Sequence, residues 1–256
     1  MNKLKKILDN SQTAYGIFTA LKEPAIIEII GYAGYDFAVI DLEHSTMNLS
    51  TMENMIRAAQ VVNITSVVRT PQDDYGTILR AVEAGADAVM VPHVTTREQA
   101  EKIVAMAKYQ PIGQRGIDAS TRVAKFGGIS VNLEDHMQTQ NERIAIIGMI
   151  EDAEAVQNIE EIVTADGLDL LFIGPSDLSA SYGFPGQVRH PIVQDAIQEV
   201  IDKANKAGVK VGIPAFEPSQ VKEVIGMGAS YVTTPAVEAS YLTQALKAHL
   251  ESIKLS

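Results

Sequence analysis

The sequence predicts an α/β protein built as a closed (β/α)₈ barrel. Short apolar runs alternate with amphipathic helical patterns eight times along the 256 residues, and eight strand–helix units close a barrel of this kind. The length is also typical of one such barrel, so residues 1–256 are expected to form a single domain. A doubly wound open sheet is the alternative that the same alternation allows.

The predicted strands are short runs of mainly aliphatic residues, as expected for strands buried on both faces of a parallel sheet. In chain order they are Tyr15–Thr19, Phe37–Asp41, Ser66–Arg69, Ala88–Val91, Ile144–Ile150, Leu170–Ile173, Val209–Ile213 and Tyr231–Thr233.

Eight helices are predicted from apolar residues at helical spacing. They lie near Pro24–Ala33, Ser50–Val62, Tyr75–Ala84, Thr96–Ala107, Ala153–Thr164, Pro191–Ala207, Pro218–Met227 and Val237–Leu250. Glycines stand at or just past the ends of five of them, where a left-handed residue is favoured. The segment 108–143 is too long for a routine connection, and long loops in compact domains are usually functional or mobile. Within it, Arg115 suits either an anionic ligand or a structural turn.

Composition excludes several classes of function. The chain has 21 basic and 32 acidic residues, a formal charge of −11, and no cysteine or tryptophan. The acidic balance argues against a nucleic-acid surface, and the lack of cysteine excludes disulfide and thiolate chemistry. Neither a signal peptide nor an apolar run of membrane-spanning length is present. We therefore expect a soluble cytoplasmic protein that binds neither nucleic acid nor membranes.

Two carboxylates follow neighbouring predicted strands. Glu151 comes directly after the fifth strand, and Asp177 belongs to the Gly174–Asp177 corner after the sixth. Parallel strands lie about 4.8 Å apart, so both carboxylates can reach one oxygen-liganded divalent cation. The alternative is that each carboxylate caps the helix that follows it.

Other polar groups also stand at strand ends, where barrels of this fold carry their chemistry. His44 suits proton transfer, because histidine is the side chain that changes charge most readily near neutral pH. Asp41 lies three residues earlier and could orient the His44 ring, while Arg69 offers a permanently charged fork to a substrate oxygen. An ordinary loop or core histidine is the alternative for His44. His93 also stands at a strand end, and its role stays open.

An imine mechanism is disfavoured because it needs a lysine inside the barrel mouth. Lys22 lies beyond the end of its strand, and Lys210 lies at the opposite end of its own. A metal-dependent mechanism is therefore expected.

Five spaced motifs, which lie along nearly the whole chain, resemble the HpcH/HpaI aldolase family, class II pyruvate aldolases related to the citrate lyase β chain. The motifs are Asp36–His44, Val67–Arg69, Pro111–Gly116, Ile150–Glu151 and Phe172–Leu178. The resemblance implies a modified (β/α)₈ barrel, a hexamer built as a trimer of dimers, and exchange of the last helix between subunits. It also implies a divalent metal (Mg, Mn or Co) and reversible cleavage of 2-keto-4-hydroxy acids to pyruvate and an aldehyde.

The resemblance also implies roles for individual residues. Glu151 and Asp177 match the metal ligands, Arg69 the arginine that holds the pyruvate oxygen, and His44 with Asp41 the acid–base pair. The backbone of Gly174, Pro175, Ser176 and Asp177 matches the cradle of the pyruvate carboxylate. The chain departs from the family pattern at Met149, at Gln110 and at Thr234-Pro235-Ala236, and these departures concern the aldehyde acceptor more than the core chemistry.

The leading hypothesis is an aldehyde-lyase acting on a 2-keto-3-deoxy sugar acid or a related 4-hydroxy-2-oxo acid. An oxaloacetate decarboxylase, or a related lyase that makes the same pyruvate enolate, is the alternative within enzymes. An inactive barrel that binds a ligand is the alternative outside them. The sequence does not name the aldehyde, the metal, the stereochemistry or the pathway.

Overall fold

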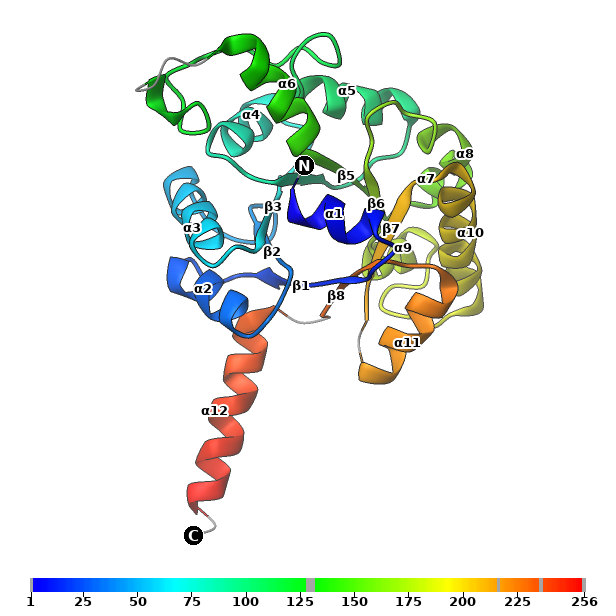
Figure 1. The fold of residues 1–256 in the computed structure, drawn as a ribbon. Helices are drawn as coiled ribbons and strands as arrows, with labels where there is room; N and C mark the ends of the chain where they lie inside the picture. Colours follow the sequence, from blue (N-terminus) through cyan, green and yellow to red (C-terminus); the bar gives the residue numbers. More distant parts are fainter. Residues whose placement is uncertain (1, 128–131, 216, 235–236, 255–256) are drawn as a thin grey trace.

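Eight parallel strands close into a barrel in sequence order (Figure 1). The computed structural model describes residues 2–127, 132–215, 217–234 and 237–254. The strands are β1 (Ala14–Thr19), β2 (Phe37–Asp41), β3 (Thr65–Arg69), β4 (Ala88–Val91), β5 (Ala145–Ile150), β6 (Leu170–Ile173), β7 (Lys210–Pro214) and β8 (Tyr231–Thr233). Pairing of β8 with β1 closes the ring, which confirms the predicted barrel and rules out the open sheet.

The helices surround this barrel, and most of them lie where the sequence predicts them. The helices are α1 (Lys3–Asp9), α2 (Pro24–Tyr32), α3 (Leu49–Val61), α4 (Tyr75–Glu83), α5 (Arg97–Ala107), α6 (Leu133–Arg143), α7 (Ala153–Gln157), α8 (Ile159–Ile162), α9 (Pro175–Ser181), α10 (Pro191–Ala207), α11 (Pro218–Met227) and α12 (Glu238–Lys254), with a 3₁₀ turn η1 at Lys125–Gly127. The glycines predicted to end helices all have positive φ.

The sequence prediction was wrong about one helix and missed three. The single helix predicted over Ala153–Thr164 is divided into α7 and α8 at Asn158, whose side-chain amide donates to the Thr95 carbonyl at 2.9 Å. The helices α1, α6 and α9 were not predicted, because each is short or mostly polar and has no broad apolar stripe. As a result, segment 108–143 is partly helical rather than a single long loop.

Aromatic rings fill the inside of the barrel. Phe37 and Tyr231 stack with their ring centroids 4.1 Å apart. Two strand glycines make room for them: a Cβ on Gly16 would lie 2.0 Å from the Phe37 ring, and one on Gly212 would lie 2.3 Å from Tyr231. These glycines are therefore required by close packing rather than by backbone conformation.

Helix α1 covers the end of the barrel where the strands begin and lies across the ring of strands in Figure 1. Leu4 and Leu8 are buried in the same cluster as Phe37 and Tyr231. Asn2 caps the helix and also donates to the carbonyls of Asp87 and Arg143, at 2.8 Å each. Helix α1 therefore closes the end of the barrel where the strands begin.

Helix α12 begins at the barrel and then extends away from it (Figure 1). The buried carboxylate of Glu238 accepts hydrogen bonds from the backbone N–H groups of Ala20 and Leu21, at 2.6–3.0 Å. Beyond it the apolar side chains are exposed, and they are Tyr241, Leu242, Leu246, Leu250 and Ile253. An amphipathic terminal helix could pack on the barrel of its own chain, but beyond its first turn α12 does not do so. No described helix is long and apolar enough to cross a membrane.

Candidate active site

The predicted site residues gather at the end of the barrel where the strands finish. Asp41 and Arg69 are the last residues of β2 and β3 and are paired in register. Glu151 directly follows β5, and Gly174 directly follows β6. The pairing of Ile150 with Ile173 and a 3.1 Å bond from the Gly174 N–H to the Ile150 carbonyl hold the latter two strand ends together.

Arg69 is held in one orientation by two carboxylates. Its Nε and one terminal nitrogen donate to the Asp41 carboxylate at 2.9 and 2.6 Å, and the other terminal nitrogen lies 2.9 Å from Glu43 Oε2. The guanidinium also lies over the Phe18 ring, 4.8 Å from its centroid. A bidentate guanidinium–carboxylate pair restricts orientation strongly, so the fork is preorganised at the barrel mouth.

His44 lies beside this pair with an exposed side chain, 68% accessible. Its Nε2 is 3.8 Å from Glu43 Oε2. The Asp41 carboxylate accepts the His44 backbone N–H at 3.3 Å and the Glu43 N–H at 2.9 Å, while both of its oxygens bind Arg69. Asp41 therefore orients the loop that carries His44, and the ring itself faces Glu43.

Glu151 is the buried carboxylate on the other side of the mouth. It is 2% exposed, and its Oε1 accepts the backbone N–H of His93 at 2.9 Å. The pKa of Glu151 is raised to about 7, mainly by burial and also by the negative charges of Asp177 and Glu43, which together outweigh the hydrogen bond and the charge of His93. The predicted alternative, that Glu151 caps the next helix, does not hold, because Asp152 occupies the N-cap position of α7.

The corner after β6 approaches Glu151 closely. A Cβ on Gly174 would lie 2.5 Å from Glu151 Oε2, so the carboxylate needs a glycine there. Helix α9 begins at Pro175, and its N-cap residue, Gly174, has no side chain with which to cap it. Ser176 and Asp177 are exposed in the first turn. The structure thus brings Asp177 into electrostatic range of Glu151, as the two strand ends predict.

His93 and Glu43 extend the site beyond the residues predicted for it. His93 has a positive φ of 54°, and its Nδ1 lies 2.9 Å from Asp152 Oδ2. Partial burial lowers the pKa of His93, but the hydrogen bond to Asp152 and the charges of Glu151 and Asp152 outweigh it, so the pKa is raised overall. Glu43 received no predicted role. Its position two residues after the end of β2 is the feature of the sequence that could have indicated a place in the site.

The donor set fits a hard divalent cation that shares its coordination with substrate or water. Glu151 is buried, has a raised pKa and is surrounded by other acids, so a cation beside it would relieve the repulsion. Across the described ranges, no three His, Asp or Glu side chains form a ready-made metal site. Glu151 and Asp177 alone would leave coordination positions open, as a catalytic site requires.

The lysines do not favour imine chemistry. Lys22 is exposed and donates to the Thr46 hydroxyl, and Lys210 is the first residue of β7. Burial lowers the pKa of Lys108, but its ion-pair partner Asp169 lies before β6, at the closed end of the barrel. Lys108 and Lys210 are therefore away from the strand ends that carry Arg69 and Glu151, and the exposed Lys22 amine is engaged by Thr46.

Arg115 lies outside this cluster. It is buried, with its guanidinium 4.3 Å from the centroid of the Tyr109 ring. The departures from the family pattern at Pro235 and Ala236 fall outside the described residues. Met149 is buried inside the barrel, and Gln110 precedes a cis proline.

Comparison with known proteins agrees with this geometry. Residues 14–246 match the family described as HpcH/HpaI aldolase/citrate lyase. The chain belongs to this family. A 5-keto-4-deoxy-D-glucarate aldolase of Shigella boydii serotype 18 is 35% identical over 231 residues, which cover 90% of this chain and 88% of the relative.

Two solved structures of similar proteins extend the comparison. A family member from Burkholderia cenocepacia J2315 has 32% identity and a TM-score of 0.92, covering 99% of this chain and 100% of its own. The citrate synthase SbnG has 33% identity and a TM-score of 0.89, covering 98% and 97%. Members of the HpcH/HpaI family are aldolases and lyases that act on carbon–carbon bonds, and this chain is an enzyme of that class.

Proposed function

We propose that this protein is a metal-dependent aldolase that reversibly cleaves a 2-keto-4-hydroxy acid into pyruvate and an aldehyde. The observation that carries this proposal is the position of Glu43. Its carboxylate pairs with Arg69 and its charge also raises the pKa of Glu151. Arg69 and Glu151 therefore lie around one shared space, where a single small substrate would touch both.

Glu151 and Asp177 would hold the divalent ion, whether Mg, Mn or Co. When bound, such an ion supplies Lewis-acid stabilisation of the negative charge that develops on the keto oxygen. Arg69 adds a fixed positive charge beside the same oxygen. The backbone of Gly174–Asp177 would cradle the pyruvate carboxylate, with the N–H groups of Ser176 and Asp177 as donors. Both stand in the first turn of α9 and lack partners within the helix, whereas Pro175 has no N–H and the Gly174 N–H donates to Ile150.

His44 would accept the proton of the substrate hydroxyl. Its ring is exposed at the mouth, and Asp41 holds the loop that carries it. A neighbouring carboxylate, Glu43 in this structure, would stabilise the protonated ring. The route of the proton is then hydroxyl to His44 during cleavage, and the reverse during aldol addition.

The proposed substrate class is a 2-keto-3-deoxy sugar acid. The curated relative is named for a keto-deoxy sugar acid of this kind. Arg69 and the α9 amides would bind the pyruvate half, which every substrate of the class shares. The remaining half would determine the aldehyde.

The proposed assembly is a hexamer built as a trimer of dimers, with α12 exchanged between subunits. The exposed apolar side chains of α12 support it, because a helix with such a stripe needs a partner surface. Glu238 fixes the start of the helix, so the remainder is directed toward a neighbour.

The test of the metal mechanism is pyruvate release from a 2-keto-3-deoxy sugar acid. Activity should disappear with EDTA and return with Mg²⁺, Mn²⁺ or Co²⁺. Glu151→Gln should abolish it while the circular dichroism spectrum is unchanged, and the exposed Glu154→Gln in α7 is the matched control. Full activity in chelated enzyme would contradict the proposal. A borohydride-trapped pyruvyl adduct would instead establish an imine mechanism.

A further inference from the structure

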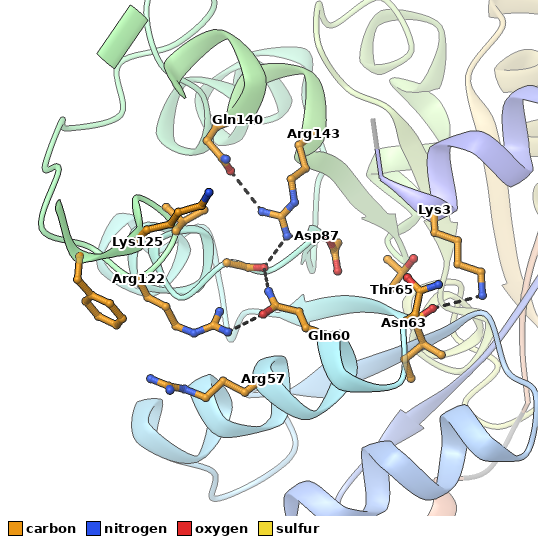
Figure 2. A pocket seen from close by; sticks show the side chains of 14 residues that line it. Lys3, Arg57, Gln60, Asn63, Thr65, Asp87, Arg122, Lys125, Gln140 and Arg143 are labelled. Atoms are coloured by element: carbon orange, nitrogen blue, oxygen red, sulfur yellow. Dashed lines mark hydrogen bonds and ion pairs between the residues drawn. The ribbon is translucent and has the colours of Figure 1, made fainter. Parts of the chain in front are cut away.

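A second cavity lies at the opposite end of the molecule from the candidate active site. It has a volume of about 760 Å³. Its lining comes from α1, the second half of α3, the start of β3, the turn before β4, η1 with the segment before it, and the end of α6 (Figure 2). Thr65, the first residue of β3, lines it, whereas Arg69, the last, belongs to the mouth. The cavity is therefore separate from the proposed chemistry.

The lining is strongly cationic in a protein with a formal charge of −11. Its described residues include five cations and one acid, which are Lys3, Arg57, Arg122, Lys125, Arg143 and Asp87. We call this cavity the cationic pocket. The acid is paired with Arg143 at 2.7 Å. The remaining positive charge is concentrated on one concave surface.

Arg122 is held by neutral acceptors, which orient its guanidinium without neutralising it, whereas Arg143 pairs with Asp87. Arg122 donates to the Ala84 carbonyl and to the Gln60 amide oxygen, at 2.5 Å each, and Arg143 donates to the Gly85 carbonyl at 2.7 Å. Burial and the like charges of Arg57 and Arg143 lower the pKa of Arg122. At the rim, Arg57 pairs with Glu53, and Lys3 lies 3.7 Å from Asp36.

A buried hydroxyl adds a second sign of a ligand. Thr65 is 1% exposed, and its Oγ1 has no hydrogen-bond partner among the described residues. Buried polar atoms are normally paired. The amides of Gln60, Asn63 and Gln140 stand around the same cavity (Figure 2), and they can bind the hydroxyl groups of a small molecule.

We propose that the cationic pocket binds a small polyanion, either a phosphate ester or a polycarboxylate with hydroxyl groups. Guanidinium forks match both phosphate and carboxylate oxygens, and the volume lies within the range of small-molecule sites, about 300–1,000 Å³. Such a ligand would bind far from the barrel mouth. It is therefore a second ligand of the enzyme rather than part of its substrate.

Calorimetric titration of the metal-free full-length protein, in EDTA at fixed ionic strength, tests this. Pyrophosphate and citrate are the two probes. The probe that binds with the lower Kd indicates whether the natural ligand is a phosphate ester or a polycarboxylate. Replacing Arg57 and Lys125 by Gln together should weaken binding about tenfold or more, since two charge-assisted contacts are lost. Arg189→Gln with Lys222→Gln is the matched control, because Arg189 likewise pairs with a surface glutamate.

Thr65→Val provides a second variant that keeps the shape of the side chain. It should weaken binding of the probe severalfold. It should not lower the melting temperature of the protein without the probe, because the Thr65 hydroxyl makes no hydrogen bond to the described residues. Arg69→Gln should leave binding unchanged. Loss of binding in Arg69→Gln, equal loss in the control pair, or no binding of either probe would overturn the proposal. The proposal would also be overturned if replacing Arg57 and Lys125 changed the sedimentation coefficient but not the affinity for the probe. The cavity would then be a contact between copies of the chain.

Discussion

Glu43 influences both charged groups of the mouth, through an ion pair with Arg69 and through its effect on Glu151. Three acids, Glu43, Glu151 and Asp177, therefore interact around one space. Burial of Glu151, together with the repulsion of Asp177 and Glu43, raises the pKa of Glu151.

The first prediction at the residue scale concerns pH. Glu151 binds its proton more tightly in the folded protein, where its pKa is about 7, than in the unfolded chain, where it is near 4.5. This stability is complete below pH 4.5 and is lost as pH rises to about 7, with a total of at most about 3 kcal/mol. Melting temperatures in EDTA across this range should show the decline, and Glu151→Gln should flatten it. An equal slope in the variant would contradict this assignment.

The second residue-scale prediction separates proton transfer from charge stabilisation. His44→Ala should lower aldol cleavage by roughly 10²–10⁴-fold, the usual contribution of general acid–base catalysis. Metal affinity and pyruvate binding should persist, along with part of any oxaloacetate decarboxylation, which deprotonates no hydroxyl. His249→Ala, on exposed α12, is the control. Near-normal cleavage by His44→Ala would transfer the role to His93 or to a water molecule.

At the element scale, α12 exposes large apolar side chains that include Leu242, Leu246 and Leu250. If it packs on a neighbouring subunit, replacing Leu246 and Leu250 by Glu should bury two charges in the contact and split the oligomer. Ser240→Glu with Gln244→Glu adds the same charge on another face of the helix. Analytical ultracentrifugation at micromolar concentration should show the smaller species only in the first variant. A wild-type protein that sediments as a monomer would refute the proposed hexamer.

At the scale of the whole molecule, we propose that residues 1–256 unfold as one domain, with α1 as part of its core. Leu8 is 2% exposed at the closed end of the barrel. Leu8→Ala should lower the free energy of unfolding by about 2–5 kcal/mol and keep a single transition in denaturant melts followed by circular dichroism. Ile192→Ala, on the surface of α10, should change it little. Two separate transitions would contradict the single domain.

The sequence by itself determined the alternation of strands and helices and made a closed barrel the leading prediction. All eight strands are local apolar runs, and their alternation with eight helices allows a barrel or an open sheet. The pairing of β8 with β1 decided between the two. The sequence also indicated which residues stand at strand ends, since this follows from where each run stops. The motifs that resemble the family lie at those ends, so the sequence alone indicates Glu151, Asp177, Arg69 and His44 as site residues.

Only the tertiary structure decided which of these groups touch. The Asp41 carboxylate binds Arg69 rather than the His44 ring, and Glu43 lies between the two halves of the mouth. Helix α1 has only two buried leucines, too few for a periodic signal, and the cationic pocket draws on residues from Lys3 to Arg143. Periodicity is a local property of the chain. Ion pairs and cavities depend instead on distances across the barrel, and these exist only once the barrel has closed.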